Sequence, residues 1–304
     1  MVKKLISRKK FLLSTITGIA GLSLINNPLK SMSIPASGLR TIGRTGISVT
    51  PVCFGAPRTN EESLIKYAID KGINFIDTGR AYGNGNNERL VGRAVLGRRN
   101  KIIIQSKIRL ESDELPLKGK GKQGAEEIRH ALDSKLQASL KAFGTDYIDI
   151  LLYHDAADEN LLYHSETMKF FSDSKKNGLI KACGFSTHND NMNLHARNNK
   201  ENFYDVIMVP FNHKGSFVHS VTGRYSEWDQ DTLISILEEA NAKGTGIIAM
   251  KTCSGGKYSP SPDIVPGYPE GVKWVLQKKY ISSAAIAMAS FEEVDEHLSL
   301  LNIP

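Results

Sequence analysis

The chain has 304 residues, 40% of them hydrophobic and 8% aromatic, and its formal net charge at pH 7 is +7. Residues 1–33 hold six of the 39 lysines and arginines and none of the 32 aspartates and glutamates, so the remaining chain carries 33 minus 32, or +1. The positive charge therefore belongs to the N-terminus and gives no support to a nucleic-acid partner. The cysteines Cys53, Cys183 and Cys253 form no Cys-x-x-Cys pair, so the sequence indicates neither a disulfide framework nor a zinc site.

The first 33 residues are typical of an export signal. A basic start is followed by residues 11–25, an uncharged run of 15 residues that is too short for a comfortable membrane span. Residues 7–12, Ser-Arg-Lys-Lys-Phe-Leu, resemble the twin-arginine (Tat) motif, with Lys9 where the second arginine normally stands. We therefore expect export to a bacterial periplasm. Ordinary secretion and an uncleaved N-terminal anchor stay open beside the Tat route.

From residue 39 onward, short apolar runs alternate with amphipathic segments. Residues 39–42 and 47–49 flank Gly43-Arg44-Thr45-Gly46 and predict a hairpin that caps the bottom of a barrel. Eight strands are then expected, at residues 50–54, 74–77, 101–107, 148–154, 181–186, 205–209, 246–251 and 284–287. A helix is expected after each of them, at residues 61–71, 87–96, 125–142, 167–176, 191–198, 231–243, 271–278 and 292–300. Eight such pairs predict an α/β protein, a (β/α)8 TIM barrel that forms one domain over residues 34–304.

An open doubly wound sheet is the alternative fold. It would normally carry a Gly-x-Gly-x-x-Gly turn after its first strand, but the chain reads Phe54-Gly55-Ala56-Pro57-Arg58 there. The glycine-rich residues 83–88 follow the second strand, and we interpret them as a loop in which Asn86 or Asn87 caps the next helix. The barrel is therefore the favoured fold.

Ionisable side chains stand at the ends of three successive predicted strands. The second strand ends at Asp77, with Tyr82 just beyond it, and the next two strands end at Lys107 and His154. The carboxyl ends of barrel strands open into the active-site mouth, and an aspartate, lysine or histidine is costly in a core without a partner. We therefore expect these four side chains to form one catalytic cluster.

These residues, with residues 40–49, 75–78 and 178–186, resemble the aldo/keto reductase family from about residue 39 to the C-terminus. The resemblance implies an NAD(P)-dependent oxidoreductase that reduces an aldehyde or ketone, or oxidises the corresponding alcohol or sugar. It also implies that the four residues form the catalytic tetrad.

The chemistry of hydride transfer gives each member of the tetrad a role. Hydride moves from a nicotinamide to a carbonyl carbon while the carbonyl oxygen receives a proton. Tyr82 would be that acid, and the Lys107 ammonium would bring its pKa closer to neutral pH. Asp77 would keep Lys107 charged and oriented. His154 would point a ring N–H at the substrate oxygen.

The resemblance implies a cofactor site that departs in part from the family pattern. Ser186 matches a residue that holds the nicotinamide amide, whereas Thr187 and Met208 stand where Asn and Gln are usual, and Met250 replaces a stacking aromatic. The residues implied at the cofactor are Gly55, Ala56, Ser186, Met250, Lys251, Cys253, Ser290 and Glu296. The loops after strands seven and eight, including residues 252–257, would bind its phosphates. NADP(H) is expected, while Glu292 and Glu293 keep NAD(H) open because like charge opposes a 2′-phosphate.

Two unusual loops predict how the substrate is bound. Residues 109–124 and 212–228 are rich in basic side chains, histidines and aromatics, and indicate a lid or pocket wall for an anionic or polyhydroxylated substrate. Ordinary solvated loops are the alternative. No third ligand accompanies His213 and His219, so no metal is expected.

The expected partners are a small carbonyl or sugar substrate and the export machinery. An exported barrel that only binds a carbohydrate or a partner protein is the alternative function. Because free nicotinamide cofactor is not expected outside the cytoplasm, an exported reductase would have to carry its cofactor through export already bound.

Overall fold

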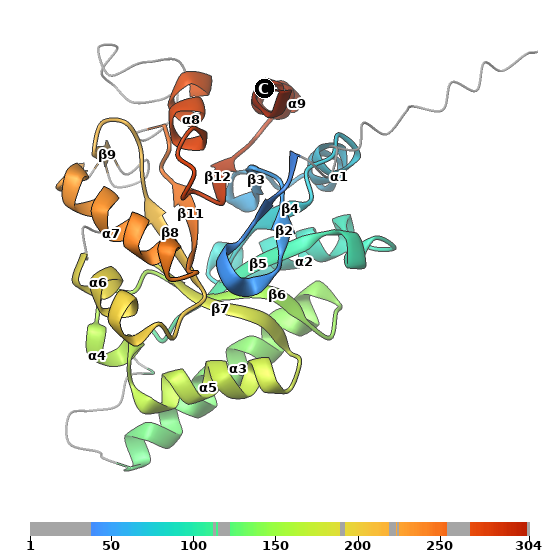
Figure 1. Cartoon of the computed structure of the whole chain (residues 1–304). Coiled ribbons are helices and arrows are strands. Elements are labelled where there is room, and N and C mark those ends of the chain that lie inside the picture. Colours follow the sequence, from blue (N-terminus) through green and yellow to red (C-terminus); the bar gives the residue numbers. More distant parts are fainter. Residues whose placement is uncertain are drawn as a thin grey trace, which may run out of the picture. The chain divides into compact units, whose positions relative to one another are not determined.

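The barrel is visible in a computed structural model of the chain, which describes residues 38–111, 114, 122–188, 192–218, 223, 225–253 and 268–302. Eight parallel strands close in the order β11-β12-β3-β4-β5-β6-β7-β8, with helices around them (Figure 1). The barrel strands are β3 (Val52–Gly55), β4 (Phe75–Asp77), β5 (Ile103–Ile108), β6 (Ile148–Tyr153), β7 (Ile180–Ser186), β8 (Val206–Pro210), β11 (Gly246–Met250) and β12 (Ser283–Ala287). The predicted (β/α)8 fold is confirmed, and the open sheet is excluded.

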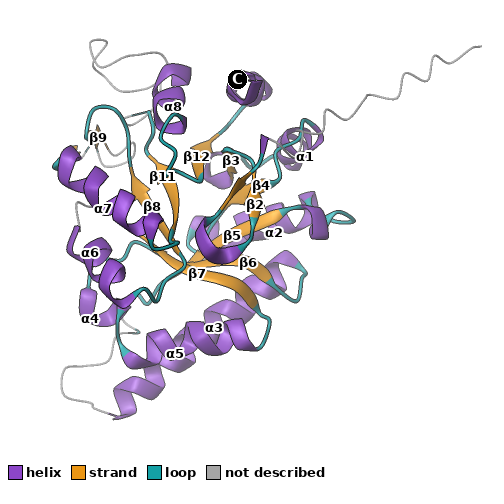
Figure 2. Cartoon of the chain, in the orientation of Figure 1, coloured by secondary structure: helices purple, strands orange, loops and turns teal. Residues whose placement is uncertain are grey.

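Helices follow the strands, as the sequence predicts (Figure 2). They are α1 (Glu62–Asp70), α2 (Asn86–Ala94), α3 (Lys122–Phe143), α4 (Glu159–Leu162), α5 (Ser165–Lys176), α6 (Met192–Glu201), α7 (Gln230–Ala242), α8 (Tyr268–Leu276) and α9 (Phe291–Leu298). The short helix α4 and an antiparallel hairpin, β9 (Ser216–Val218) with β10 (Tyr225–Glu227), were not expected. This hairpin lies in the segment that the sequence indicated as a substrate loop.

Strand side chains alternate between the barrel interior and the helix layer. Ile150 and Leu152 belong to the inner apolar cluster, whereas Leu151 between them packs in the outer one. The same alternation on β5 directs Ile104 and Ile108 outward. Positions 105 and 107 of this strand therefore face the barrel interior, where a polar side chain needs a partner.

The N-terminal hairpin closes the bottom of the barrel. Strand β1 (Arg40–Thr41) pairs with β2 (Ser48–Val49), and the buried side chains Ile42, Ile47 and Val49 join the inner cluster. Gly43 has a φ of +45°, and a Cβ there would collide with the backbone of Gly244 and Gly246 before and at the start of β11. Only glycine therefore allows the turn to sit this close to the strand. Figure 1 shows the hairpin, in blue, in front of the ring of strands.

The beginning of helix α2 differs from the prediction. Its N-cap is Gly85, with a φ of 79° and no side-chain hydrogen bond, so neither Asn86 nor Asn87 is the cap. Asn87 is buried instead: its Nδ2 donates to the Ala56 carbonyl at 2.9 Å and its Oδ1 accepts from Thr78 at 2.6 Å. The asparagine was misassigned because its partners lie on other loops and are invisible to local sequence patterns.

The described residues contain no helix that is long and apolar enough to cross a membrane. Residues 1–37 lie outside the described part of the chain. The export signal at residues 1–33 and the domain boundary at residue 34 therefore stay predictions.

Candidate active site

The four predicted catalytic residues meet at the carboxyl ends of neighbouring strands. Asp77 is the last residue of β4, Lys107 lies in β5, and His154 directly follows β6. Tyr82 begins the short 3-10 helix at Tyr82–Gly85, in the connection after β4. Because β4, β5 and β6 are consecutive in the barrel, the sequence prediction that these side chains lie together is confirmed by their contacts.

Lys107 is the buried centre of the cluster. Its Nζ donates to Asp77 Oδ1 at 2.5 Å and to the Thr78 carbonyl at 2.8 Å, and the residue is 1% exposed. Burial lowers the pKa of Lys107, but the Asp77 carboxylate and the Tyr82 phenol more than offset this, so the pKa lies above its ordinary 10.5. Lys107 is therefore an ammonium at all physiological pH values.

Gln105 is a member of the cluster that the sequence analysis missed. Its Nε2 donates to Asp77 Oδ1 at 2.6 Å, and the residue is completely buried. Asp77 Oδ1 therefore accepts two hydrogen bonds from side chains of β5. The available signal was a glutamine two positions before Lys107, which strand alternation places on the same interior face.

Tyr82 packs between Lys107 and His154. The Lys107 Nζ lies 5.2 Å from the centroid of the tyrosine ring, and the ring meets that of His154 edge to face, with centroids 5.7 Å apart. Burial raises the pKa of Tyr82 above its ordinary 10.0, the Lys107 ammonium opposes this rise, and Asp77 adds to it. Lys107 thus lowers the Tyr82 pKa, as the sequence analysis expects, but desolvation outweighs the ammonium and the net pKa lies above 10.0. The phenol stays protonated, which suits an acid.

His154 is a neutral imidazole. Burial first, and then the charge of Lys107, lower its pKa to about 2. Its Nδ1 is buried and has no hydrogen-bond partner among the described residues.

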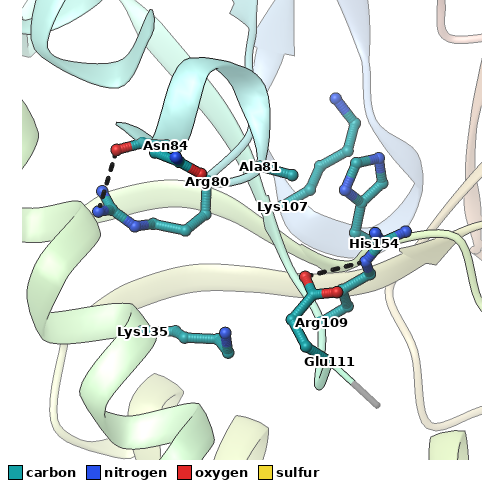
Figure 3. Close-up of a pocket in the computed structure, with 8 residues that line it drawn as sticks. All are labelled: Arg80, Ala81, Asn84, Lys107, Arg109, Glu111, Lys135 and His154. Atoms are coloured by element: carbon teal, nitrogen blue, oxygen red, sulfur yellow. Dashed lines mark hydrogen bonds and ion pairs between the residues drawn. The ribbon is translucent and has the colours of Figure 1, made fainter. Parts of the chain in front are cut away.

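A pocket of about 420 Å³ opens beside the tetrad. It is lined by Arg80, Ala81, Asn84, Lys107, Arg109, Glu111, Lys135 and His154. Figure 3 shows Lys107 and His154 side by side, with Arg80 and Asn84 on one side and Arg109 and Glu111 on another. Lys135 comes from helix α3, and its position depends on helix packing that the sequence did not reveal. Of the predicted loop at residues 109–124, Arg109 and Glu111 reach this pocket.

The residues that the sequence analysis expects at the nicotinamide lie at the end of β7, within β8 and at the end of β11. Ser186 Oγ accepts from the Asp155 amide at 3.0 Å, and Ser186 is fully buried. Thr187 is fully buried, with its Oγ1 3.4 Å from His195 Nε2 of helix α6, so it points into the protein rather than toward a cofactor. Met208 and Met250 are buried in the inner cluster. The role of Ser186 at the cofactor thus stays a prediction, and the Thr187 side chain is directed toward His195.

Lys251 has the properties of an anion-binding residue. It follows β11 with a φ of 56°, and its Nζ lies 5.4 Å from the centroid of the Phe217 ring. Burial, and then the charge of Lys107, lower its pKa. No carboxylate of the described residues lies within ion-pair distance of this ammonium. A half-buried cation without an acidic partner fits a phosphate group of a dinucleotide.

Of the remaining implied cofactor residues, Cys253 follows β11, Ser290 is the N-cap of α9, and Glu296 lies in α9. Cys253 and Glu296 lie near each other: burial raises the pKa of the Cys253 thiol to about 11, and the Glu296 carboxylate adds to the rise. Ser290 Oγ accepts from the Glu293 amide at 3.2 Å, and Glu293 Oε2 accepts from the Ala289 amide at 2.7 Å. The start of helix α9 is therefore capped by its own side chains.

Two of the implied cofactor residues, Gly55 and Ala56, lie at the end of the first barrel strand, β3, and directly after it. A Cβ on Gly55 would lie 2.8 Å from the Ile286 carbonyl oxygen of β12, so this glycine is required by strand packing, and Ala56 beside it is fully buried. Residues 254–257 of the predicted phosphate loop, and His219 of the predicted substrate loop, lie outside the described residues. Among the described residues, no three metal-ligating side chains come together.

A barrel with a buried ammonium, a protonated phenol and a neutral imidazole at the mouth defines the class of oxidoreductases that pair hydride with proton transfer. The sequence profile of the Aldo/keto reductase family matches residues 55–298, and the chain belongs to this family.

Individual relatives are distant. Over 303 residues the chain is 24% identical to L-galactose dehydrogenase of Arabidopsis thaliana, covering 86% of this chain and 87% of that protein. It is 28% identical to the uncharacterized oxidoreductase YqkF of Bacillus subtilis over 176 residues, which is 56% of this chain and only 55% of YqkF. Among solved structures, the aldo/keto reductase of Klebsiella pneumoniae in complex with NADP and acetate superposes with a TM-score of 0.62 at 20% identity, covering 87% of this chain and 90% of that one. The similarity to the Klebsiella pneumoniae structure, at this identity, shows that the two chains share a fold.

Proposed function

We propose that this aldo/keto reductase reduces an aldehyde or ketone with NADP(H), or oxidises the corresponding alcohol or sugar, with Tyr82 as the acid and base. The observation that carries the proposal is the convergence of Asp77, Lys107, Tyr82 and His154 at the carboxyl ends of β4, β5 and β6, where Lys107 and His154 line a pocket. A barrel that only binds carbohydrate would have no need for a buried lysine and aspartate pair, which is costly to desolvate.

The residues of this chain divide the proton chemistry among them. The nicotinamide, when bound, supplies the hydride for the carbonyl carbon. Tyr82 gives its hydroxyl proton to the carbonyl oxygen, and the Lys107 ammonium beside it stabilises the phenolate that remains. His154, neutral at working pH, donates a ring N–H to the same oxygen and orients the carbonyl. Asp77 keeps Lys107 in place.

Replacing Tyr82 by phenylalanine tests this assignment. Loss of the acid should reduce kcat with aldehyde substrates by ~10²-fold to 10⁴-fold, while binding of NADPH, followed by its fluorescence, survives. If the Tyr82→Phe variant turned over substrate as fast as the wild-type protein, another group would have to be the acid. Failure of the wild-type protein to bind either NADPH or NADH would contradict the proposed function itself.

The cofactor is proposed to be NADP(H), with Lys251 at one of its phosphates. The half-buried Lys251 ammonium, which has no acidic partner among the described residues, supports a phosphate ligand, and the Klebsiella relative was solved with NADP. Glu293, whose charge argued for NAD(H), is engaged with the Ala289 amide and with Arg58 Nη1 at 3.5 Å. Part of its charge is thereby offset. Comparing dissociation constants for NADPH and NADH decides between the two cofactors.

Export is the second part of the proposal. The basic and apolar residues 1–33 support a signal of the Tat type, which carries folded proteins with their cofactor, and a periplasmic location. The cofactor would then stay bound and be reduced and reoxidised by two alternating substrates. Fractionation of cells that produce the full chain, with a Arg8→Gln, Lys9→Gln double variant as the comparison, tests the route. An absorbance spectrum of the exported protein without nucleotide would contradict the retained cofactor.

A further inference from the structure

We infer that Gln105 is a positioning residue of the active site, which holds the Asp77 carboxylate against the Lys107 ammonium beside Tyr82. This inference rests on the proposed function, because it concerns the same tetrad. Three observations carry it: the hydrogen bonds that Asp77 Oδ1 accepts, the place of Gln105 in β5, and a buried oxygen of the glutamine amide that has no partner among the described residues.

Two side chains of β5 donate to one oxygen of Asp77. Gln105 Nε2 donates to Asp77 Oδ1 at 2.6 Å, and Lys107 Nζ donates to the same oxygen at 2.5 Å. Hydrogen bonds to an ionised acceptor are roughly twice as strong as those between neutral groups. The carboxylate oxygen that faces Lys107 is therefore held by a second strong donor, which carries no charge of its own.

The pairing of the strands places Gln105 beside Asp77. The two residues are register partners in the parallel pairing of β4 with β5, and the Gln105 carbonyl accepts from the Thr78 amide at 3.0 Å. Lys107 lies two positions further along β5 and faces the same interior of the barrel. Gln105 thus reaches Asp77 from the level of the carboxylate itself, and Lys107 reaches it from the next level toward the mouth.

The charge of Asp77 determines which way the glutamine amide points. A reversed amide would place its carbonyl oxygen against the carboxylate, and two acceptors would then meet without a proton between them. Nε2 therefore faces Asp77, where it also lies 3.4 Å from Met208 Sδ, a weak acceptor. Oε1 is directed elsewhere, and this buried atom has no hydrogen-bond partner among the described residues.

The unpaired oxygen argues against a purely structural role. Buried polar atoms are nearly always hydrogen-bonded, because leaving one unpaired costs free energy. Asn198 of helix α6, which is also fully buried, follows this rule: its Nδ2 donates to the Tyr204 carbonyl at 3.2 Å, and its Oδ1 accepts from the Tyr204 amide at 3.0 Å. Gln105 is paired only at the end that faces Asp77. Its amide thus lowers stability at one end and fixes the tetrad at the other.

The contact that Gln105 maintains affects the protons of the tetrad. Burial has the largest effect on the Tyr82 pKa and raises it; after burial, the Lys107 ammonium lowers this pKa and the Asp77 carboxylate raises it. Burial lowers the pKa of Lys107, and Asp77 raises it. The terminal torsion of an aspartate is soft, so without Gln105 the carboxylate is free to turn and to hold Lys107 less closely. Both pKa values then fall.

The pH dependence of carbonyl reduction tests this role. With NADPH and benzaldehyde as the probe, the basic limb of kcat/KM in Gln105→Met should move to lower pH by at least ~0.5 unit. An opposite charge at this distance shifts a pKa by roughly 1 to 3 units, and a looser contact loses part of that shift. Gln105→Leu provides a second apolar replacement if the first does not fold.

Other ionisable groups surround Lys107 and Tyr82. Those that act electrostatically on either residue, or respond to the Lys107 charge, are Asp77, Cys53, His154, Asp155 and Lys251. Gln105→Met replaces none of them and changes no charge. The titration of Tyr82 itself is measured beside the rate profile, so that Cys53 or Lys251 is not mistaken for it.

A titration of the Tyr82 phenol needs neither substrate nor cofactor. The absorbance of the phenolate is followed with pH in the wild-type protein and in Gln105→Met, and the curve of the matching Tyr82→Phe variant is subtracted from each. The difference isolates Tyr82 from the other tyrosines. Its midpoint should move to lower pH in Gln105→Met, in the same direction as the basic limb.

Asn198→Leu is the matched control for the loss of a buried amide. It leaves the Tyr204 amide without this acceptor, so the urea midpoint of unfolding should fall, while the basic limb and the Tyr82 titration stay in place. In Gln105→Met the urea midpoint should stay close to that of the wild-type protein. The substitution removes an unpaired buried oxygen together with the hydrogen bond.

The outcomes separate the inference from the proposed function. A basic limb and a Tyr82 titration that stay unmoved, or move to higher pH, in both Gln105 variants overturn the inference. An equal shift in Asn198→Leu overturns it too, because the shift would then follow from any loss of a buried amide. A Tyr82 titration that moves as expected, in a protein that neither binds NADPH nor reduces benzaldehyde, supports the positioning of Asp77 but contradicts the proposed function.

Discussion

Lys107 Nζ lies 2.5 Å from Asp77 Oδ1, and both residues are almost completely buried at the mouth of the barrel. Neither charge could stay there alone, because an uncompensated buried ion costs several kcal/mol. The pair also acts on the pKa values of its neighbours, after the larger effect of burial. It keeps an ammonium beside Tyr82 and, through that charge, helps to keep His154 neutral.

Removing one partner of this pair should destabilise the fold more than removing both. Asp77→Asn should lower the free energy of unfolding by about 3 to 5 kcal/mol, because it leaves Lys107 buried without its carboxylate. Adding Lys107→Met to this variant should restore much of the stability while leaving turnover abolished. Urea unfolding followed by circular dichroism measures both effects. A double variant less stable than Asp77→Asn would show that the pair is not the source of the effect.

The pH dependence should have opposite signs for reduction and oxidation. Carbonyl reduction requires protonated Tyr82, whose pKa is raised by burial above 10.0, so kcat/KM should be flat from about pH 6 to 9 and fall only above pH 10. Alcohol oxidation requires the phenolate and should rise over the same alkaline range. Because His154 titrates at about 2, no limb near pH 6.5 is expected. A limb near pH 6.5 that disappears in His154→Gln would contradict the neutral imidazole.

Lys251 should contribute to cofactor affinity. In Lys251→Met the dissociation constant for NADPH should rise by ~10-fold or more, since one charge-assisted hydrogen bond to a phosphate is lost. The exposed Lys243, which pairs with Glu239 at 2.7 Å, offers a matched control in Lys243→Met. Quenching or enhancement of cofactor fluorescence gives both constants. Equal affinities in the two variants would remove Lys251 from the phosphate site.

Two glycines of the N-terminal hairpin should differ in their tolerance of alanine. Gly46 has a φ of +72° but nothing within 4 Å of an added Cβ, so Gly46→Ala should cost only about 1 to 2 kcal/mol for the left-handed backbone. Gly43→Ala should cost at least ~2 kcal/mol more, because its Cβ collides with the backbone of Gly244 and Gly246. Thermal unfolding of both variants measures the difference. Equal losses would show that the hairpin can move away from the strand.

The proposed export signal at residues 1–33 depends on sequence alone. Such a signal can be predicted from its composition and from the length of its apolar run, because signals are recognised by these features rather than by a fold.

Much of the catalytic site could be predicted because strand ends are local features. An apolar run that stops at Asp77, Lys107 or His154 shows both the strand and its open end, and parallel pairing then brings such ends together. Gln105 was equally visible in the sequence, but its role emerged only from the 2.6 Å contact with Asp77. The predicted cap at Asn86 or Asn87 was wrong: the N-cap is Gly85, and the partners of Asn87, Thr78 and Ala56, come from other loops.

The sequence by itself determined the barrel, the order of its elements, the family and which four ionisable side chains meet at the barrel mouth. Their spacing and alternation depend only on local geometry. Tertiary structure decided the pKa of Tyr82, the pairing of Arg109 with Glu111, and the entry of Lys135 into the pocket wall. Desolvation and ion pairing depend on everything that surrounds a group, and residues distant in sequence supply most of those surroundings.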